Sequence, residues 1–119
     1  MTCVTSSARP WPSFVACHPR LAAYVVVRDR TGRVAAVRSA GVGPARFWLP
    51  GGESHPGEPP ELTVAREVRE EVGHVIRLAG RIGDAVQIFH AATEQRWYEM
   101  KAAFFRFFHA CHAWAVSQA

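Results

Sequence analysis

The sequence predicts one α/β (α+β) domain in which a mixed β-sheet is built around a single strong helix. Runs of strand length that are rich in β-branched residues lie on both sides of residues 61–72, whose charged and apolar side chains separate onto two sides of a helix. A chain of 119 residues is large enough for one core and too small for two. We expect residues 1–19 to form a loosely ordered N-terminal segment and residues 20–119 to form the domain.

The first strands are expected directly after this segment. The run "LAAYVVVRD" from Leu21 reads as a strand, "DRTG" as a turn, and "RVAAVRS" as the returning strand of a hairpin. "FWLP" reads as a short strand that ends at Pro50. The stretch from Gly51 to Pro60 is rich in glycine and proline, and long loops of this kind usually carry function.

A helix is predicted over residues 61–72. Pro59 and Pro60 suit its entry, where a missing N–H costs nothing, and Gly73 suits the position just past its end. Val64, Val68 and Leu62 are expected on its apolar side.

The second half of the chain reads as further strands. "HVIRLAGRIGDAVQIF" predicts one or two strands with a bend near Gly80 to Gly83, "ATEQ" a turn, and "RWYEMKAAFFRFF" a strongly apolar strand. Only eleven residues follow Phe108, which allows about two or three helical turns at this shortened C-terminal end.

The last turns of the predicted helix concentrate negative charge. Glu67, Glu70 and Glu71 fall within an arc of about 100°. Like-charged neighbours cost roughly 0.2–0.5 kcal/mol per pair, and the helix C-terminus disfavours anions by roughly 0.3–1 kcal/mol more. Arg66 can offset part of this repulsion, but one cation cannot neutralise three carboxylates. The pattern therefore indicates a missing positive partner.

Composition excludes several classes of protein. The net charge is +4, but the arginines are spread along the chain, which favours a small anionic ligand over a nucleic acid. The sequence contains no run of about 18 or more apolar residues, so a membrane span is not expected. The first nineteen residues lack the apolar region of a signal peptide. The chain has three cysteines, Cys3, Cys17 and Cys111, which are far apart in the sequence. An odd number at such spacing indicates reduced intracellular thiols and not a disulfide framework. We therefore expect a cytoplasmic protein.

The loop and helix together resemble the Nudix box, the signature G-x5-E-x7-R-E-U-x-E-E-x-G-U of the Nudix (MutT-like) hydrolases, where U is bulky and aliphatic. Val68 fills the first U, and His74 departs from the last. At roughly 6% usage per residue type, seven fixed identities coincide by accident about once in 10⁸ starting points. All seven are present: Gly52, Glu58, Arg66, Glu67, Glu70, Glu71 and Gly73.

The resemblance implies a Nudix-type mixed sheet sandwiched by helices, with residues 61–72 as the catalytic helix. It also implies hydrolysis of a pyrophosphate linkage in a nucleoside diphosphate derivative, with Mg²⁺ or Mn²⁺ as cofactor. Arg66 matches the arginine that orients the acidic cluster, Glu67 a ligand sometimes assigned as the base, and Glu58 a loop glutamate that braces the loop or holds an outer-shell water. The implied metal ligands are the backbone oxygen of Gly51 and the side chains of Glu67, Glu70 and Glu71, and the implied catalytic residues are Arg66, Glu67, Glu70 and Glu58.

Further candidates lie outside the box. Many family members recruit a late acid, for which Glu94 or Glu99 could serve. Arg28 and Arg46 could clamp phosphates, or they could be solvated surface arginines. Phe47 and Trp48 could stack on a nucleobase, or they could pack in the core. The candidate substrate-binding residues are thus Arg28, Arg46, Phe47, Trp48 and Glu99.

Three questions stay open at this level. No proline follows Pro60, whereas the ADP-ribose-hydrolysing branch typically has one, so nucleoside triphosphates, oxidised ones included, are favoured over ADP-ribose or dinucleotides. A catalytically silent nucleotide-binding domain is the alternative to an enzyme. The cover that a final helix usually provides could be a short helix, the N-terminal segment, or a second subunit in a homodimer.

Overall fold

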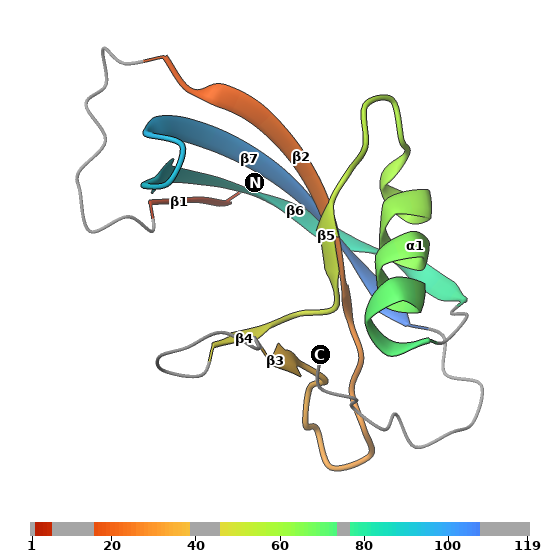
Figure 1. Ribbon diagram of the computed structural model, residues 1–119. Helices are drawn as coiled ribbons and strands as arrows, with labels where there is room; N and C mark the ends of the chain where they lie inside the picture. The colour runs from red at the N-terminus through yellow and green to blue at the C-terminus, as the bar shows by residue number, and fades with distance from the viewer. Residues whose placement is uncertain (1, 6–15, 39–45, 74–76, 108–119) are drawn as a thin grey trace.

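A five-stranded mixed sheet with helix α1 on one face forms the body of the protein (Figure 1). The computed structural model describes residues 2–5, 16–38, 46–73 and 77–107. The strand order is β1 (Thr2–Thr5), β6 (Leu78–Ala91), β7 (Arg96–Phe107), β2 (His18–Val26) and β5 (Gly51–Glu53). Strands β3 (Val37–Arg38) and β4 (Phe47–Trp48) form a separate two-stranded sheet.

The main sheet is mixed, as predicted. Strands β6 and β7 form an antiparallel hairpin, β5 is antiparallel to β2, and both β1–β6 and β2–β7 are parallel pairs. Strand β6 is a single strand whose register shifts between Leu78 and Gly80 and again between Arg81 and Gly83. The predicted bend near Gly80 is therefore a pair of strand irregularities, not a break between two strands.

Helix α1 spans Pro60–Val72 and confirms the predicted helix at both ends. Pro59 precedes it in an extended conformation, and Gly73 ends it in the left-handed region at φ 74°. The N–H of Gly73 donates to the carbonyl of Arg69 at 2.9 Å. Glycine closes the helix here because it reaches positive φ without a Cβ clash.

The core lies between α1 and the sheet. Val64 and Val68 are fully buried, and burying each is worth roughly 1.5–3 kcal/mol. Leu62, in contrast, is 59% exposed, so its predicted place on the buried side was wrong. At about 100° per residue it lies about 200° from Val64 around the helix axis. The buried cluster is completed by Ala23, Val25, Val27, Ala103 and Phe105.

The predicted hairpin at residues 21–39 is only partly formed. The returning strand of the hairpin stays beside β2 only briefly, through an Arg28–Val34 bridge and a 2.9 Å hydrogen bond from Ala35 N–H to the Val27 carbonyl. It then turns away, and Val37–Arg38 pairs with Phe47–Trp48.

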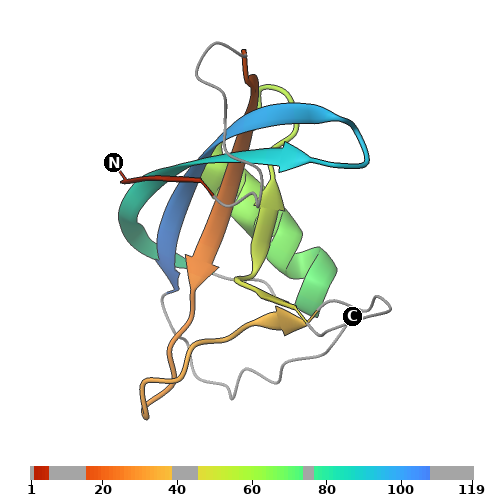
Figure 2. The same cartoon turned by 90° about the vertical axis from the view of Figure 1, so that its left-hand side faces the viewer.

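The N-terminal region contributes strands that were not predicted. Thr2–Thr5 form β1 at the edge of the sheet, and β2 begins already at His18, inside the expected lead-in. Figure 2, in which the sheet lies in front of α1, shows β1 beside β6. Residues 108–119, where a short final cover was expected, lie outside the described residues.

Within the described ranges, no helix is long and apolar enough to cross a membrane.

Candidate active site

Two glycines bring the loop of the predicted box between the sheet and the helix. A Cβ on Gly52 would lie 2.8 Å from the Cδ of Glu67, and one on Gly51 would lie 2.1 Å from the Ala23 carbonyl oxygen. Gly51 also adopts φ 140°, which other residues rarely reach. A side chain on Gly52 would push the loop away from α1, and one on Gly51 would push it away from β2.

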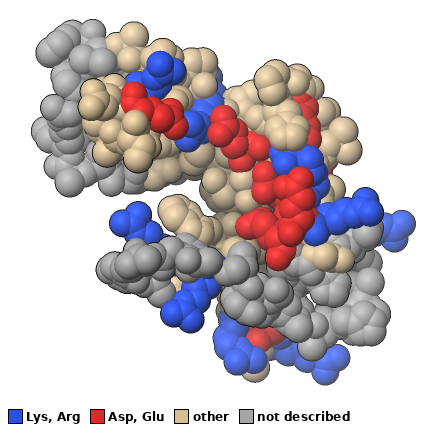
Figure 3. All heavy atoms as spheres, viewed as in Figure 1, with Lys and Arg blue, Asp and Glu red and all other residues tan. Residues whose placement is uncertain are grey.

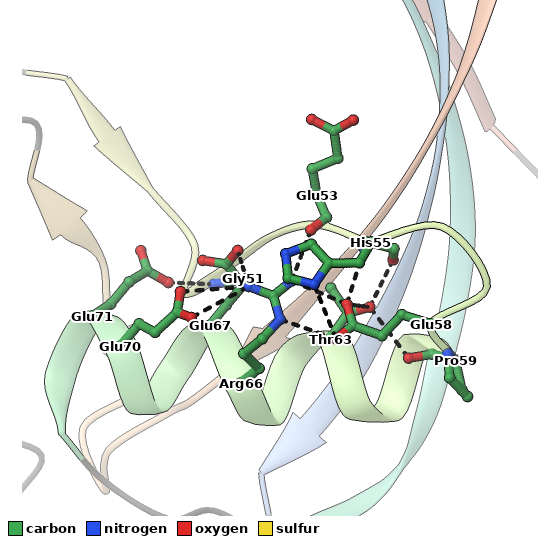
Figure 4. Close-up of polar contacts among 11 residues, drawn as sticks. Gly51, Glu53, His55, Glu58, Pro59, Thr63, Arg66, Glu67, Glu70 and Glu71 are labelled. Carbon is green, nitrogen blue, oxygen red and sulfur yellow. Dashed lines mark hydrogen bonds and ion pairs between the residues drawn. The ribbon is translucent and has the colours of Figure 1, made fainter.

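Arg66 is the centre of the polar network in Figure 4. Its Nε donates to Glu58 Oε2 at 2.9 Å, and its Nη2 donates to Glu58 Oε1 at 3.0 Å and to the Glu53 carbonyl at 3.1 Å. Its Nη1 donates to Glu67 Oε1 at 3.0 Å and to Glu70 Oε2 at 3.4 Å. This planar fork connects the loop with the carboxylates of the helix.

Glu58 is held from three directions. It accepts from Arg66, from the backbone N–H of His55 at 3.1 Å and from the hydroxyl of Thr63 at 2.8 Å. These donors, Arg66 first, lower the pKa of Glu58 to about 2. Thr63 is fully buried, so this loop is fixed to the first turns of α1 by a satisfied polar contact. Such contacts are what bracing of the loop requires.

Glu67, Glu70 and Glu71 lie along one side of α1, and the acidic side chains form one patch over the helix in Figure 3. Glu71 Oε1 accepts the N–H of Gly51 at 2.9 Å. Burial raises the pKa of Glu71, and the charges of Glu67 and Glu70 raise it further against the opposing effect of that hydrogen bond. Of the cations that the structure describes, only Arg66 forms ion pairs with these glutamates, and it pairs with Glu67 and Glu70 but not with Glu71. Negative charge in this patch therefore remains largely uncompensated.

The donor atoms fit a hard divalent cation in type, but the side chains must rotate to bind one. As they stand, no three His, Cys, Asp or Glu side chains of the described residues converge closely enough to hold a metal ion. Carboxylate and backbone carbonyl oxygens are the ligands that Mg²⁺ and Mn²⁺ favour. Glu70 is 58% exposed and loosely held, so its side chain is free to turn.

Phe47 and Trp48 lie just before the loop in the sequence. Both lie on β4, which leads through Leu49 and Pro50 into Gly51 at the start of β5 (Figure 1). Phe47 is 65% exposed and Trp48 54% exposed, so neither packs in the core. Arg46, which directly precedes them, is exposed as well. This part of the candidate substrate site is accessible to a ligand.

Arg28 is not brought to the carboxylates. Its Nη2 lies 3.7 Å from the position of a Cβ on Gly32, so the side chain folds over its own hairpin.

The two candidate late acids also lie elsewhere. Glu94 accepts the hydroxyl of Tyr98 and lies in the turn between β6 and β7, far along the sheet from α1 (Figure 1). Glu99 pairs with Pro19 and Ile88, and its charge adds to burial in raising the pKa of Cys17. Neither side chain joins the acidic patch on the helix.

The structure adds residues that the motif does not contain. Glu53 accepts from Arg66 through its carbonyl, and its side chain lies 3.3 Å from the Nε of Arg20. The guanidinium of Arg20 covers the ring of Tyr98, 3.9 Å from its centroid. Tyr24 pairs with Gly51 across β2 and β5. Strand alternation could have placed Arg20 and Tyr24 on one face, but their nearness to the loop depends on the pairing of β5, which the sequence does not reveal.

Comparisons with known proteins agree with this architecture. The sequence profile described as NUDIX domain matches residues 18–115. No curated protein matches the sequence significantly. The fold is similar to that of the MutT protein from Methanosarcina mazei, with 23% identity, a TM-score of 0.67, and coverage of 87% of this chain and 72% of the other.

Two further solved structures share the fold. A NUDIX hydrolase from Nitrosomonas europaea is 18% identical with a TM-score of 0.56, over 84% of this chain and 66% of the other. The ORF135 protein of E. coli is 16% identical with a TM-score of 0.55, over 82% of this chain and 68% of the other. Since the matching profile spans most of the sequence, the chain belongs to the NUDIX domain family of pyrophosphohydrolases.

Proposed function

We propose that the protein hydrolyses a pyrophosphate linkage in a nucleoside diphosphate derivative and uses Mg²⁺ or Mn²⁺ held by Glu67, Glu70, Glu71 and the backbone oxygen of Gly51. The observation that carries this proposal is the uncompensated charge on α1. Arg66 alone pairs with these glutamates among the described residues, and Glu71 is held in a setting that disfavours its ionised form. A divalent cation would supply the missing positive charge.

A bound divalent cation would polarise the phosphoryl oxygens and lower the pKa of a coordinated water. Arg66 would keep Glu67 aimed at the loop, since its Nη1 donates to that carboxylate at 3.0 Å. The side chain of Glu70 is more exposed and more loosely held than that of Glu67. We therefore assign to Glu70 the acceptance of the proton from the attacking water. Glu58 would act through Arg66 by fixing its guanidinium.

A nucleoside triphosphate, oxidised ones included, is our proposed substrate. Phe47 and Trp48 offer exposed aromatic faces just ahead of the loop, and such faces stack on nucleobases. Arg46 stands beside them and carries the positive charge that phosphates attract. The absence of proline after Pro60 still argues against ADP-ribose and dinucleotides.

A nucleotide-binding domain without turnover is the second candidate. It is favoured by the lack of a converged metal site among the described residues, where neither Glu94 nor Glu99 joins the helix glutamates. Against it stands the complete set of box glutamates.

A substrate panel separates these candidates. Nucleoside triphosphates, ADP-ribose and dinucleotides would be incubated with Mg²⁺ or Mn²⁺, and the products identified. We expect hydrolysis by the wild type, a loss of at least about 100-fold in kcat for Glu70→Gln, and near wild-type rates for Glu61→Gln, which lies in the first turn of the same helix. Binding without product across the panel would favour the silent domain.

We further propose that the protein acts in the cytoplasm and that it forms a homodimer. The scattered cysteines support the first of these proposals, and the exposed apolar side chains of Leu21 and Ile82 on β2 and β6 support the second. Light scattering across a concentration series measures the second directly, and a monomer throughout would exclude it.

A further inference from the structure

Tyr24 is fixed beside the loop on the face of the sheet opposite α1. Ala23 and Val25 pack with the helix valines, so strand alternation turns Tyr24 to the other face. Its Cδ1 lies 2.9 Å from the position of a Cβ on Gly51, which means that the ring occupies the space a side chain there would need. On its other side the ring stacks on Phe104, with centroids 5.7 Å apart and an interplanar angle of 25°.

The hydroxyl of this ring is a donor without an acceptor in the described part of the chain. A phenolic O–H is a hydrogen-bond donor, and it can donate to an anionic oxygen.

We propose that the Tyr24 hydroxyl donates a hydrogen bond to a non-bridging phosphate oxygen of the bound diphosphate, next to Gly51. This assignment rests on the proposed function, because the helix glutamates must draw a diphosphate to the loop through a cation. The loop glycines leave no side chain between Tyr24 and such a ligand. Tyr24 is thus a substrate-contacting residue that the Nudix box does not contain.

Two substitutions isolate the hydroxyl. Tyr24→Phe keeps the ring that stacks on Phe104 and removes only the O–H. Tyr98→Phe is the matched control, because Tyr98 lies on the same face of the sheet as Tyr24. Its hydroxyl donates to Glu94 in the β6–β7 turn. Calorimetry would measure the binding of methylene diphosphonate, a diphosphate that resists hydrolysis, in the presence of Mg²⁺.

We expect Tyr24→Phe to weaken the affinity for the diphosphonate by about 10- to 100-fold, as for one hydrogen bond to a charged group. Tyr98→Phe should stay within about twofold of the wild type, and the melting temperature of Tyr24→Phe should be unchanged. In turnover of a panel substrate, kcat/KM of Tyr24→Phe should fall by the same factor.

Equal affinity of Tyr24→Phe and the wild type would overturn the assignment. So would a loss of affinity that appears only in Tyr24→Leu, since the ring and not the hydroxyl would then matter. If the wild type binds the diphosphonate but hydrolyses nothing, the proposed enzyme fails while the affinities still decide the role of Tyr24. A wild type that binds no diphosphonate would overturn both.

Discussion

Arg66 shows how a single residue connects the two halves of the box. Its guanidinium reaches Glu58 in the loop and Glu67 in the helix at once, which a lysine could not do. Three other residues of the motif, Glu58, Glu67 and Glu70, lie around it. The motif could not indicate Thr63, which also donates to Glu58, because a threonine inside a helix has many ordinary roles.

The pH dependence of stability tests the bracing of the loop. The pKa of Glu58 is about 2 in the folded protein, below its ordinary value of 4.5. A lowered folded pKa means that the stabilisation is present above pH 4.5 and is lost as the pH falls towards 2. We therefore expect Glu58→Gln to melt at a lower temperature than the wild type at pH 7, with the difference vanishing by pH 2–3. A difference that is constant over this range would contradict the ion pair with Arg66.

Glu71 is expected to lower stability in the absence of metal. Its folded pKa is raised, so stability is present at low pH and is lost as the pH rises through that folded pKa. Glu71→Gln removes the charge but keeps an oxygen for the Gly51 N–H. In chelator at pH 7 we expect the variant to be more stable than the wild type by about 0.5–1 kcal/mol in urea unfolding. A less stable variant would show that Glu71 is already neutralised within the folded chain.

At the scale of elements, the sequence predicted the features that depend on local residues and missed those that depend on distant pairing. Pro59 and Gly73 marked both ends of α1 because proline and glycine act on the backbone directly. The predicted turn at residues 92–95 is also present. Strand β1 could not be predicted, since four residues carry no period and their pairing with β6 joins distant parts of the chain. The sequence also did not predict that β3 leaves β2, because β3 pairs instead with β4, ten residues further along the chain.

The end of the helix offers a test at this scale. Gly73 lies at φ 74°, and no atom would contact an added Cβ, so only the backbone conformation opposes a side chain there. We expect Gly73→Ala to lose about 1–2 kcal/mol in urea unfolding. Gly83→Ala is the control, since Gly83 also has free space but no positive φ, and it should change by less than about 0.5 kcal/mol. Equal losses in both variants would mean that the left-handed cap does not stabilise α1.

At the scale of the whole molecule, function and stability oppose each other. The chain has a net charge of +4, yet its glutamates gather over α1 and face a single arginine among the described residues (Figure 3). Any ligand that binds only the folded state stabilises it, by about 2.7 kcal/mol at a concentration 100 times its Kd. A cation at this patch would therefore reverse the effect of the repulsion.

Titration calorimetry with Mg²⁺ and Mn²⁺, in the presence of methylene diphosphonate, tests this account most directly. The wild type and Glu61→Gln should bind the cation saturably, and a variant with glutamine at positions 67, 70 and 71 should not. Uptake by the triple variant equal to that of the wild type, or no uptake by the wild type, would contradict the claim that these three glutamates bind a catalytic metal ion.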